Sequence, residues 1–137
     1  MRYLGLDVGD RWIGVALSDP SGKLASPFTI LKRVEELADL EAIVSIINQH
    51  DVRRVIVGLP RSMDGTLGRQ AEKVEDFTRK LRQHTEIPVE FRDERLTTVS
   101  ARQLMRASQT RKSQKRRDDA IAAAVLLQAF LDEGHSE

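Results

Sequence analysis

The chain has 137 residues, enough for one domain with a hydrophobic core and too few for two. Its 40% hydrophobic and 31% charged residues suit a globular domain in water, and no apolar run approaches the roughly 20 residues of a membrane span. The absence of cysteine excludes disulfides and thiolate metal sites and is compatible with a cytoplasmic protein, while the net charge of +1 conceals an uneven charge distribution.

Alternating apolar residues and short turns predict three antiparallel strands at the start of the chain, over Tyr3–Val8, Trp12–Ser18 and Lys23–Phe28. Apolar residues at helical spacing then predict an amphipathic helix over about Val34–His50. The apolar run Val52–Leu59 reads as a central strand that is covered on both faces.

The second half of the chain predicts alternating helices and one more strand. In order, these are a loop over Pro60–Gly68, a helix over about Leu67–His84, a strand over Pro88–Arg92, a helix capped by Thr97 or Thr98, and a final helix from near Asp118 to about Asp132. Ser108–Arg117 has no apolar residue, so we expect a mobile basic loop there. The sequence therefore predicts one α/β domain over residues 1–137, with a mixed sheet and helices on both faces.

Asp7 is the most informative residue, because it lies inside the first predicted strand rather than in the turn that follows. A carboxylate in that position is costly to bury without a compensating cation, and a divalent metal is the simplest candidate. An Asp that caps the turn is the alternative, although Gly9 and Asp10 already serve the turn. We therefore interpret Asp7 as a candidate metal ligand.

Two acids from the other half of the chain could join Asp7. Glu94 follows the last strand, at the sheet edge where such folds place ligands, although pairing with Arg92 and Arg95 would also explain it. Asp119 opens the last predicted helix, where the helix dipole alone favours acids. The small residues Ala122 and Ala123 on the same side of that helix would let it approach the sheet, which favours Asp119 over Asp118.

Basic residues gather in the same half of the chain and predict a surface that attracts polyanions. They are Arg92, Arg95, Arg102, Arg106, Arg111, Lys112, Lys115, Arg116 and Arg117. A solvated helix face with a flexible loop explains the charges equally well.

Four motifs, taken together and in order, resemble the YqgF/RuvX family of RNase H-like proteins, known as Holliday junction resolvases and as pre-16S ribosomal RNA nucleases. The motifs are Leu4–Gly9 with Ile13–Ala16 and Ser18-Asp19, Val57–Pro60 with Gly65, Asp93–Thr98, and Asp119 with Ala122-Ala123 and Leu127-Gln128. The resemblance covers nearly the whole chain. It implies the RNase H-like sheet, with three antiparallel strands beside two parallel ones. One departure is Trp12, where similar sequences carry Arg; Trp12 could stack on a base or pack, and packing is the simpler expectation.

The resemblance places the family's acidic triad on Asp7, Glu94 and Asp119, which would bind two Mg²⁺ or Mn²⁺ ions for phosphodiester hydrolysis. Arg95, Lys115, Arg116 and Arg117 would contact the phosphate backbone without reading bases. The substrate would be pre-16S rRNA, trimmed at its 5′ end, or branched DNA. A resolvase needs two active sites and hence a homodimer, whereas trimming of RNA does not.

Two other functions stay open at this point. A non-catalytic nucleic-acid-binding factor of ribosome maturation or transcription would keep the fold and the basic face and lose the cleavage. An ATP-dependent phosphotransferase of the actin and sugar-kinase type shares the hairpin with its aspartate and glycines, but it needs a second domain for which 137 residues leave no room.

Overall fold

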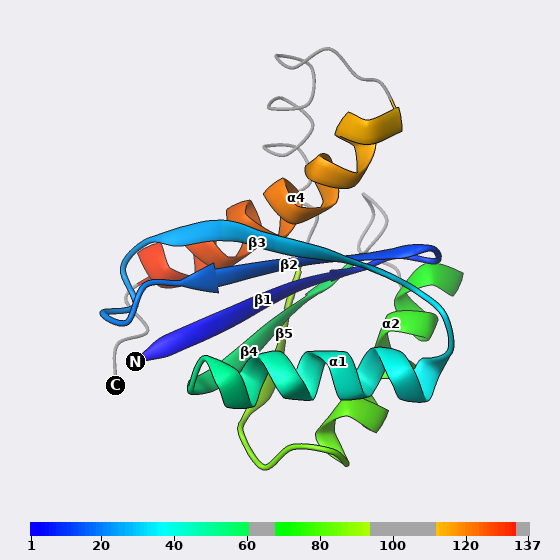
Figure 1. Ribbon diagram of the computed structural model, residues 1–137, viewed down its shortest axis with the longest axis horizontal. Coiled ribbons are helices and arrows are strands. Elements are labelled where there is room, and N and C mark those ends of the chain that lie inside the picture. Colours follow the sequence, from blue (N-terminus) through cyan, green and yellow to red (C-terminus); the bar gives the residue numbers. More distant parts are fainter. Residues whose placement is uncertain (61–67, 94–111, 134–137) are drawn as a thin grey trace.

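The computed structural model describes residues 1–60, 68–93 and 112–133, which form one five-stranded sheet with helices on both faces (Figure 1). The elements are β1 (Arg2–Val8), β2 (Trp12–Ser18), β3 (Ala25–Lys32), α1 (Glu36–Gln49), β4 (Val52–Leu59), α2 (Arg69–Arg82), β5 (Val89–Asp93) and α4 (Lys112–Asp132). In this part of the chain no helix is both long and apolar enough to cross a lipid bilayer.

The strands lie in the order β3-β2-β1-β4-β5. The first three strands pair antiparallel through two hairpins, whereas β4 pairs parallel with β1 and β5 pairs parallel with β4. The sequence predicted this mixed sheet, because short turns join antiparallel neighbours and a helical crossover joins parallel ones. The carboxyl ends of the parallel strands β1, β4 and β5 therefore lie at the same end of the sheet.

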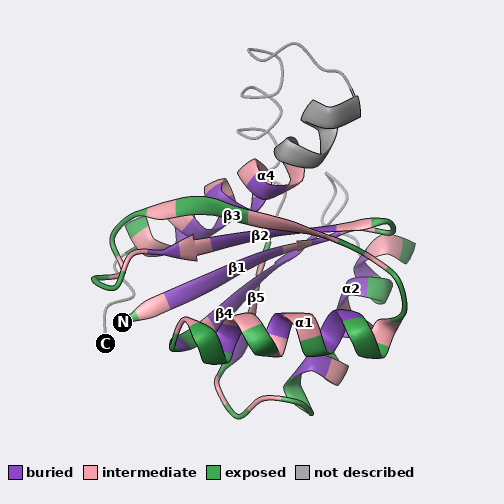
Figure 2. Cartoon of the chain, viewed as in Figure 1, coloured by how far each residue is buried: buried purple, intermediate pink, exposed green. Residues whose placement is uncertain are grey.

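Each face of the sheet has its own hydrophobic core (Figure 2). Helices α1 and α2 cover one face, where alternate strand residues such as Leu4, Leu6 and Val57 are fully buried against them. Helix α4 covers the other face, where Tyr3 and Ile56 pack with residues of α4. Because side chains alternate along a strand, the odd-numbered residues of β1 face α4.

The third strand begins two residues later and ends four residues later than the sequence predicted. The carboxylate of Asp19 accepts hydrogen bonds from the backbone N–H groups of Lys23 (2.8 Å) and Leu24 (2.9 Å), which holds both residues in the turn. The strand instead continues to Lys32, which pairs with Trp12 of β2.

The last helix is also longer than predicted. It begins at Lys112, so residues 112–117 of the expected basic loop are helical, and residues 108–111 lie outside the described part of the chain. The segment lacks apolar residues, but lysine, glutamine and arginine are strong helix formers and extend a helix that is already anchored further along. The expected helix after Thr97 and the loop at residues 61–67 lie outside the described residues.

Candidate active site

Asp7 lies near the carboxyl end of β1, on the face that α4 covers. Its cross-strand partner on β2 is Gly14, and its side chain is partly buried. Tyr3, on the same face of β1, packs in the core beneath α4. The strand thus changes from apolar packing to a carboxylate along one face, as expected for a functional group at the end of a sheet.

Helix α4 rests directly on the strands at two glycines. A Cβ atom placed on Gly14 would lie 2.0 Å from the carbonyl oxygen of Asp119, and one placed on Gly5 would lie 3.0 Å from the carbonyl oxygen of Ala123. No side chain fits at Gly14, and a side chain at Gly5 would require α4 to shift, so glycine at these positions lets the helix backbone approach the sheet. Asp7 and the backbone of Asp119 therefore both lie beside Gly14. Asp7 is opposite Gly14 on the neighbouring strand, and the Asp119 backbone packs on the face of Gly14.

The position of Asp119 inside α4 changes the interpretation of its charge. The sequence suggested that Asp118 and Asp119 could open the helix and serve its dipole. That alternative is wrong, because α4 begins at Lys112 and has no acid in its first turn. The dipole stabilises acids only in the first turn, so it does not account for an acid seven residues later.

The third predicted acid, Glu94, lies outside the described residues. Strand β5 ends just before it at Asp93, which is exposed and pairs in register with Leu59 of β4. Among the residues that the structure describes, no group of three or more histidine, cysteine or acidic side chains forms a metal site. The triad therefore remains a prediction. Asp7 lies on the face that α4 covers, α4 carries Asp119, and Glu94 follows β5 in the sequence, two strands away from β1.

The predicted phosphate contacts fall largely outside the described side chains. Arg95 is not among the described residues, and Lys115, Arg116 and Arg117 lie in the first two turns of α4, where only the backbone is described. Their contact with nucleic acid stays a prediction.

The sequence reasoning missed two exposed cations at the β1–β2 hairpin end. Arg11 lies in the turn, and Lys32 of β3 pairs in register with Trp12. The amino end of α2 lies beside the same turn, because the side-chain amide of Gln70 donates to the carbonyl oxygen of Val8 (3.3 Å). Lys32 was missed because β3 was predicted to end at Phe28, and a strand that ended there would not bring Lys32 to this hairpin.

The sequence analysis assigned no role to Asp39. Asp39 is only 5% exposed and accepts hydrogen bonds from the Arg33 Nε (3.2 Å) and the Val34 backbone N–H (3.2 Å). The Arg33 guanidinium also donates to the carbonyl oxygen of Gly9 (2.9 Å) and lies 5.0 Å from the ring centre of Phe77. This ion pair therefore joins α1 and α2 to the turn that follows Asp7.

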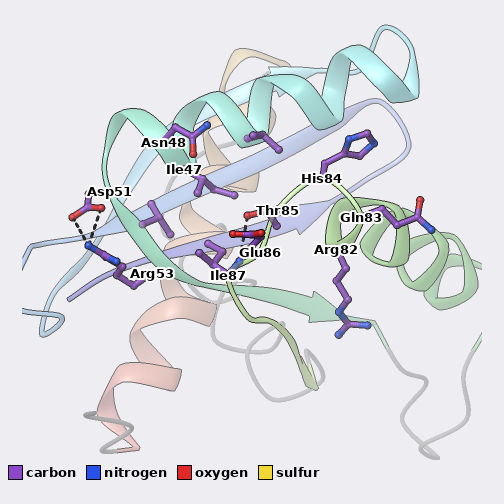
Figure 3. Close-up of a pocket in the computed structure, with 12 residues that line it drawn as sticks. Ile47, Asn48, Asp51, Arg53, Arg82, Gln83, His84, Thr85, Glu86 and Ile87 are labelled. Carbon is purple, nitrogen blue, oxygen red and sulfur yellow. Dashed lines mark hydrogen bonds and ion pairs between the residues drawn. The ribbon is translucent and has the colours of Figure 1, made fainter.

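A separate hollow of about 630 Å³ lies at the opposite end of the sheet, between the last turn of α1 and the α2–β5 connection (Figure 3). Its two arginines already have partners. Arg53 pairs with Asp51, and Arg82 donates to the carbonyl oxygen of Val89 (2.7 and 3.1 Å) while it lies over the ring of Phe91. This hollow is at the amino end of β4, so it is not part of the site around Asp7.

The sheet order and the two helical layers define an RNase H-like fold. The Thermus thermophilus RuvC structure in complex with a Holliday junction substrate matches with a TM-score of 0.64, over 100% of this chain and 98% of that chain. The sequence identity is 13%, so this likeness concerns the fold.

The chain belongs to the RuvX family, described as Holliday junction resolvase, whose model matches residues 1–133. A Clostridium botulinum (strain Hall) protein named "Putative pre-16S rRNA nuclease" is 45% identical over 133 residues, which are 96% of this chain and 97% of that protein. A Thermoanaerobacter pseudethanolicus protein of the same name is 46% identical over 134 residues, 96% of each chain. The family is one of nucleases, so hydrolysis of phosphodiester bonds is the class of reaction.

Proposed function

We propose that this chain is a divalent-metal-dependent nuclease of structured nucleic acid, with its catalytic centre at Asp7, Glu94 and Asp119. One observation carries the proposal: the backbone of Asp119 packs on Gly14, and Gly14 is the cross-strand partner of Asp7. Asp7 and the backbone of Asp119, which are 112 positions apart in the sequence, thus both lie beside Gly14, and this supports the proposal that their carboxylates share a site.

The residues at this corner suit a hard divalent cation. Carboxylate oxygens are the ligands that Mg²⁺ and Mn²⁺ prefer, and the chain has no cysteine to favour softer metals. Asp7 is a partly buried carboxylate that follows the buried residues Leu4–Leu6 in β1, where a nearby cation would offset the cost of burying the charge. Bound ions would make a water more acidic and neutralise charge on the phosphate.

The protein's own groups would bind and orient the substrate. Asp7 would hold the centre of the site, and Glu94 and Asp119 would complete it from the β5 end and from α4. Arg11 and Lys32 are exposed beside the hairpin and would bind the phosphate backbone, together with the predicted contacts Arg95 and Lys115–Arg117. Such contacts fix the register of a nucleic acid without reading its bases.

We propose pre-16S rRNA as the substrate, cut near its 5′ end. The relatives that carry the name pre-16S rRNA nuclease align along nearly the whole chain. The family description and the RuvC likeness concern Holliday junctions, so branched DNA is the substrate to compare. Cleavage of a junction on two strands would need two such sites and hence a homodimer.

The direct test compares a labelled pre-16S rRNA fragment with a labelled four-way DNA junction, each incubated with Mg²⁺, Mn²⁺ or EDTA. We expect cutting of the rRNA precursor that requires metal and is lost in Asp7→Asn. Cutting of the junction alone would overturn the choice of substrate. Binding of both without cutting in any metal would replace the nuclease by a non-catalytic binding factor.

The proposed phosphate contacts are tested by the salt dependence of binding. Each cation that neutralises one phosphate contributes about −0.7 to −0.9 to the slope of log K against log salt. Arg11→Ala and Lys32→Ala should each reduce the slope by about that amount. Arg79→Ala is the matched control, because Arg79 is exposed on α2 and pairs with Asp76, and it should leave the slope unchanged.

A further inference from the structure

We propose that Trp12 forms a base-stacking subsite beside Asp7, so that the nuclease acts on strands with an unpaired base next to the cleaved phosphate. This inference rests on the proposed function and specifies its substrate. Trp12 begins β2 at the hairpin end nearest Asp7, and its side chain is only partly buried.

The alternation along β2 places Trp12 on the same face as Asp7. Ile13, Val15 and Leu17 all pack into the core beneath α1 and α2, so Trp12 and Gly14 face the opposite side. Gly14 lies beneath the backbone of Asp119 on that side. Trp12 lies two residues before Gly14, about 7 Å closer to the hairpin at the start of β2.

The residue opposite Trp12, directly after the end of β1, is a glycine, because the Gly9 N–H donates to the Trp12 carbonyl oxygen (2.9 Å). Opposite residues of an antiparallel pair share a face, and Gly9 has no side chain to cover the indole from this direction. Asp7 is the diagonal neighbour, about 7–8 Å away in such a pair and within reach of a large side chain. The indole therefore flanks the candidate catalytic carboxylate.

A cation lies on the other side of Trp12. Lys32 of β3 is its register partner and is exposed, and Arg11 is exposed in the preceding turn. Leu31 packs into the core beneath α1 and α2, so Lys32 shares the face of Trp12. The first turns of α4 rise away from the sheet (Figure 1).

This arrangement matches the chemistry of a single nucleotide. An aromatic ring stacks on any base, a lysine binds the adjoining phosphate, and carboxylates would hold metal at the next phosphate. A base inside a continuous duplex is already stacked on both sides and offers no free face to a side chain. The subsite therefore selects an unpaired nucleotide, as at the frayed or single-stranded end of an RNA precursor, over a fully paired duplex.

The experiment uses the fluorescence of Trp12, the only tryptophan in the chain. Asp7→Asn protein, which should bind without cutting, is titrated with a single-stranded RNA and with a blunt duplex of the same sequence. We expect saturable quenching by the single strand and little change with the duplex. Equal, weak responses to both would overturn the subsite.

Substitutions then separate stacking from charge and from folding. Trp12→Phe keeps an aromatic ring and should retain single-strand affinity within about threefold, whereas Trp12→Ala should lose about tenfold with duplex affinity unchanged. Equal affinities of all three proteins would contradict the proposal, and a thermal melt of each variant identifies misfolding. If Trp12→Ala cuts the single strand as well as the wild type does, the subsite is refuted and the nuclease function stands. If single-stranded RNA quenches the Trp12 fluorescence but the wild type cuts no substrate, the nuclease function is refuted and the subsite stands.

Discussion

Gly14 and Asp119 are in direct backbone contact: a Cβ on Gly14 would lie 2.0 Å from the Asp119 carbonyl oxygen. This contact fixes where α4 crosses β2, and Gly14 is also the ladder partner of Asp7. A single glycine therefore sets the relation between two candidate metal ligands that are distant in the chain.

Replacement of Gly14 by alanine should displace α4. A Cβ cannot lie 2.0 Å from a backbone oxygen, and the helix backbone has no rotamer by which to move aside. We expect a loss of about 1–3 kcal/mol of unfolding free energy, measured by urea denaturation, with a larger relative loss of cleavage because Asp119 moves away from Asp7.

The matched control for that variant is Gly68→Ser. A Cβ on Gly68 meets no atom within 4 Å, and Gly68 is the N-cap of α2 without a side-chain capping bond. Serine is a better N-cap than glycine, so this variant should keep or slightly raise stability. If Gly14→Ala were as stable and active as Gly68→Ser, the packing of α4 on β2 would be wrong.

Removal of the buried Asp39 carboxylate should destabilise the protein strongly. Asp39→Ala leaves the Arg33 guanidinium without its ion-pair partner and the Val34 N–H without its acceptor. Loss of one partner of a buried pair typically costs about 3–5 kcal/mol, and we expect about 2–4 kcal/mol because Arg33 is 22% exposed.

Glu41→Ala on the same helix is the comparison for Asp39, since Glu41 is exposed and should change stability by less than about 0.5 kcal/mol. Thermal melts of both variants decide the matter. Equal melting temperatures would show that Asp39 contributes no more to stability than an exposed acid does.

Asp51 is a site where a substitution should stabilise the protein. It follows α1 with a φ of 52°, the left-handed conformation that glycine adopts without steric cost. Its ion pair with Arg53 is exposed at 80% and 60% and contributes little. Asp51→Gly should raise the unfolding free energy by about 0.5–1 kcal/mol in denaturant titrations, and Asp51→Ala should lower it.

Asp19 should make the stability of the β2–β3 hairpin depend on acid. Hydrogen bonds from the Leu24 backbone, the Ser21 hydroxyl and the Lys23 backbone hold the pKa of the Asp19 carboxyl well below its usual range. A depressed folded-state pKa gives stability that is present above the unfolded pKa of about 3.9 and lost as the pH falls below it.

The variant Asp19→Asn isolates this effect, because asparagine does not titrate. At pH 7 the variant should unfold at a lower temperature than the wild type, and the difference should shrink between about pH 4 and pH 2. A difference in melting temperature that stays constant over this range would contradict the pKa direction.

Local patterns predicted most of the fold. The strands Trp12–Ser18 and Val52–Leu59 have the predicted bounds, since each has turn residues at both ends. The third strand could not be located from its own residues, because its start depends on the carboxylate of Asp19 and its end on pairing with β2. The start of α4 was missed for the opposite reason: the apolar pattern that reveals a helix is absent from residues 112–117.

The candidate site could be predicted only in part. The apolar surroundings of Asp7 are visible in the sequence, and so are the small residues after Asp119. The contact between Gly14 and α4 is not visible there, because it depends on how a helix from the far end of the chain crosses the sheet. The position of Lys32 beside Trp12 likewise depends on long-range strand register. The pair of Arg33 with Asp39 is local, but the apolar pattern of the helix does not reveal it.

The most direct measurement of the central claim is the rate of metal-dependent cleavage of the rRNA precursor by Asp7→Asn, Asp119→Asn and Asp118→Asn, compared side by side with wild type. If Asp7 and Asp119 share one metal centre, both of their variants should lose at least about a hundredfold, and Asp118→Asn should stay within a few-fold of wild type. Wild-type cleavage by Asp119→Asn, or its loss in Asp118→Asn instead, would contradict the site.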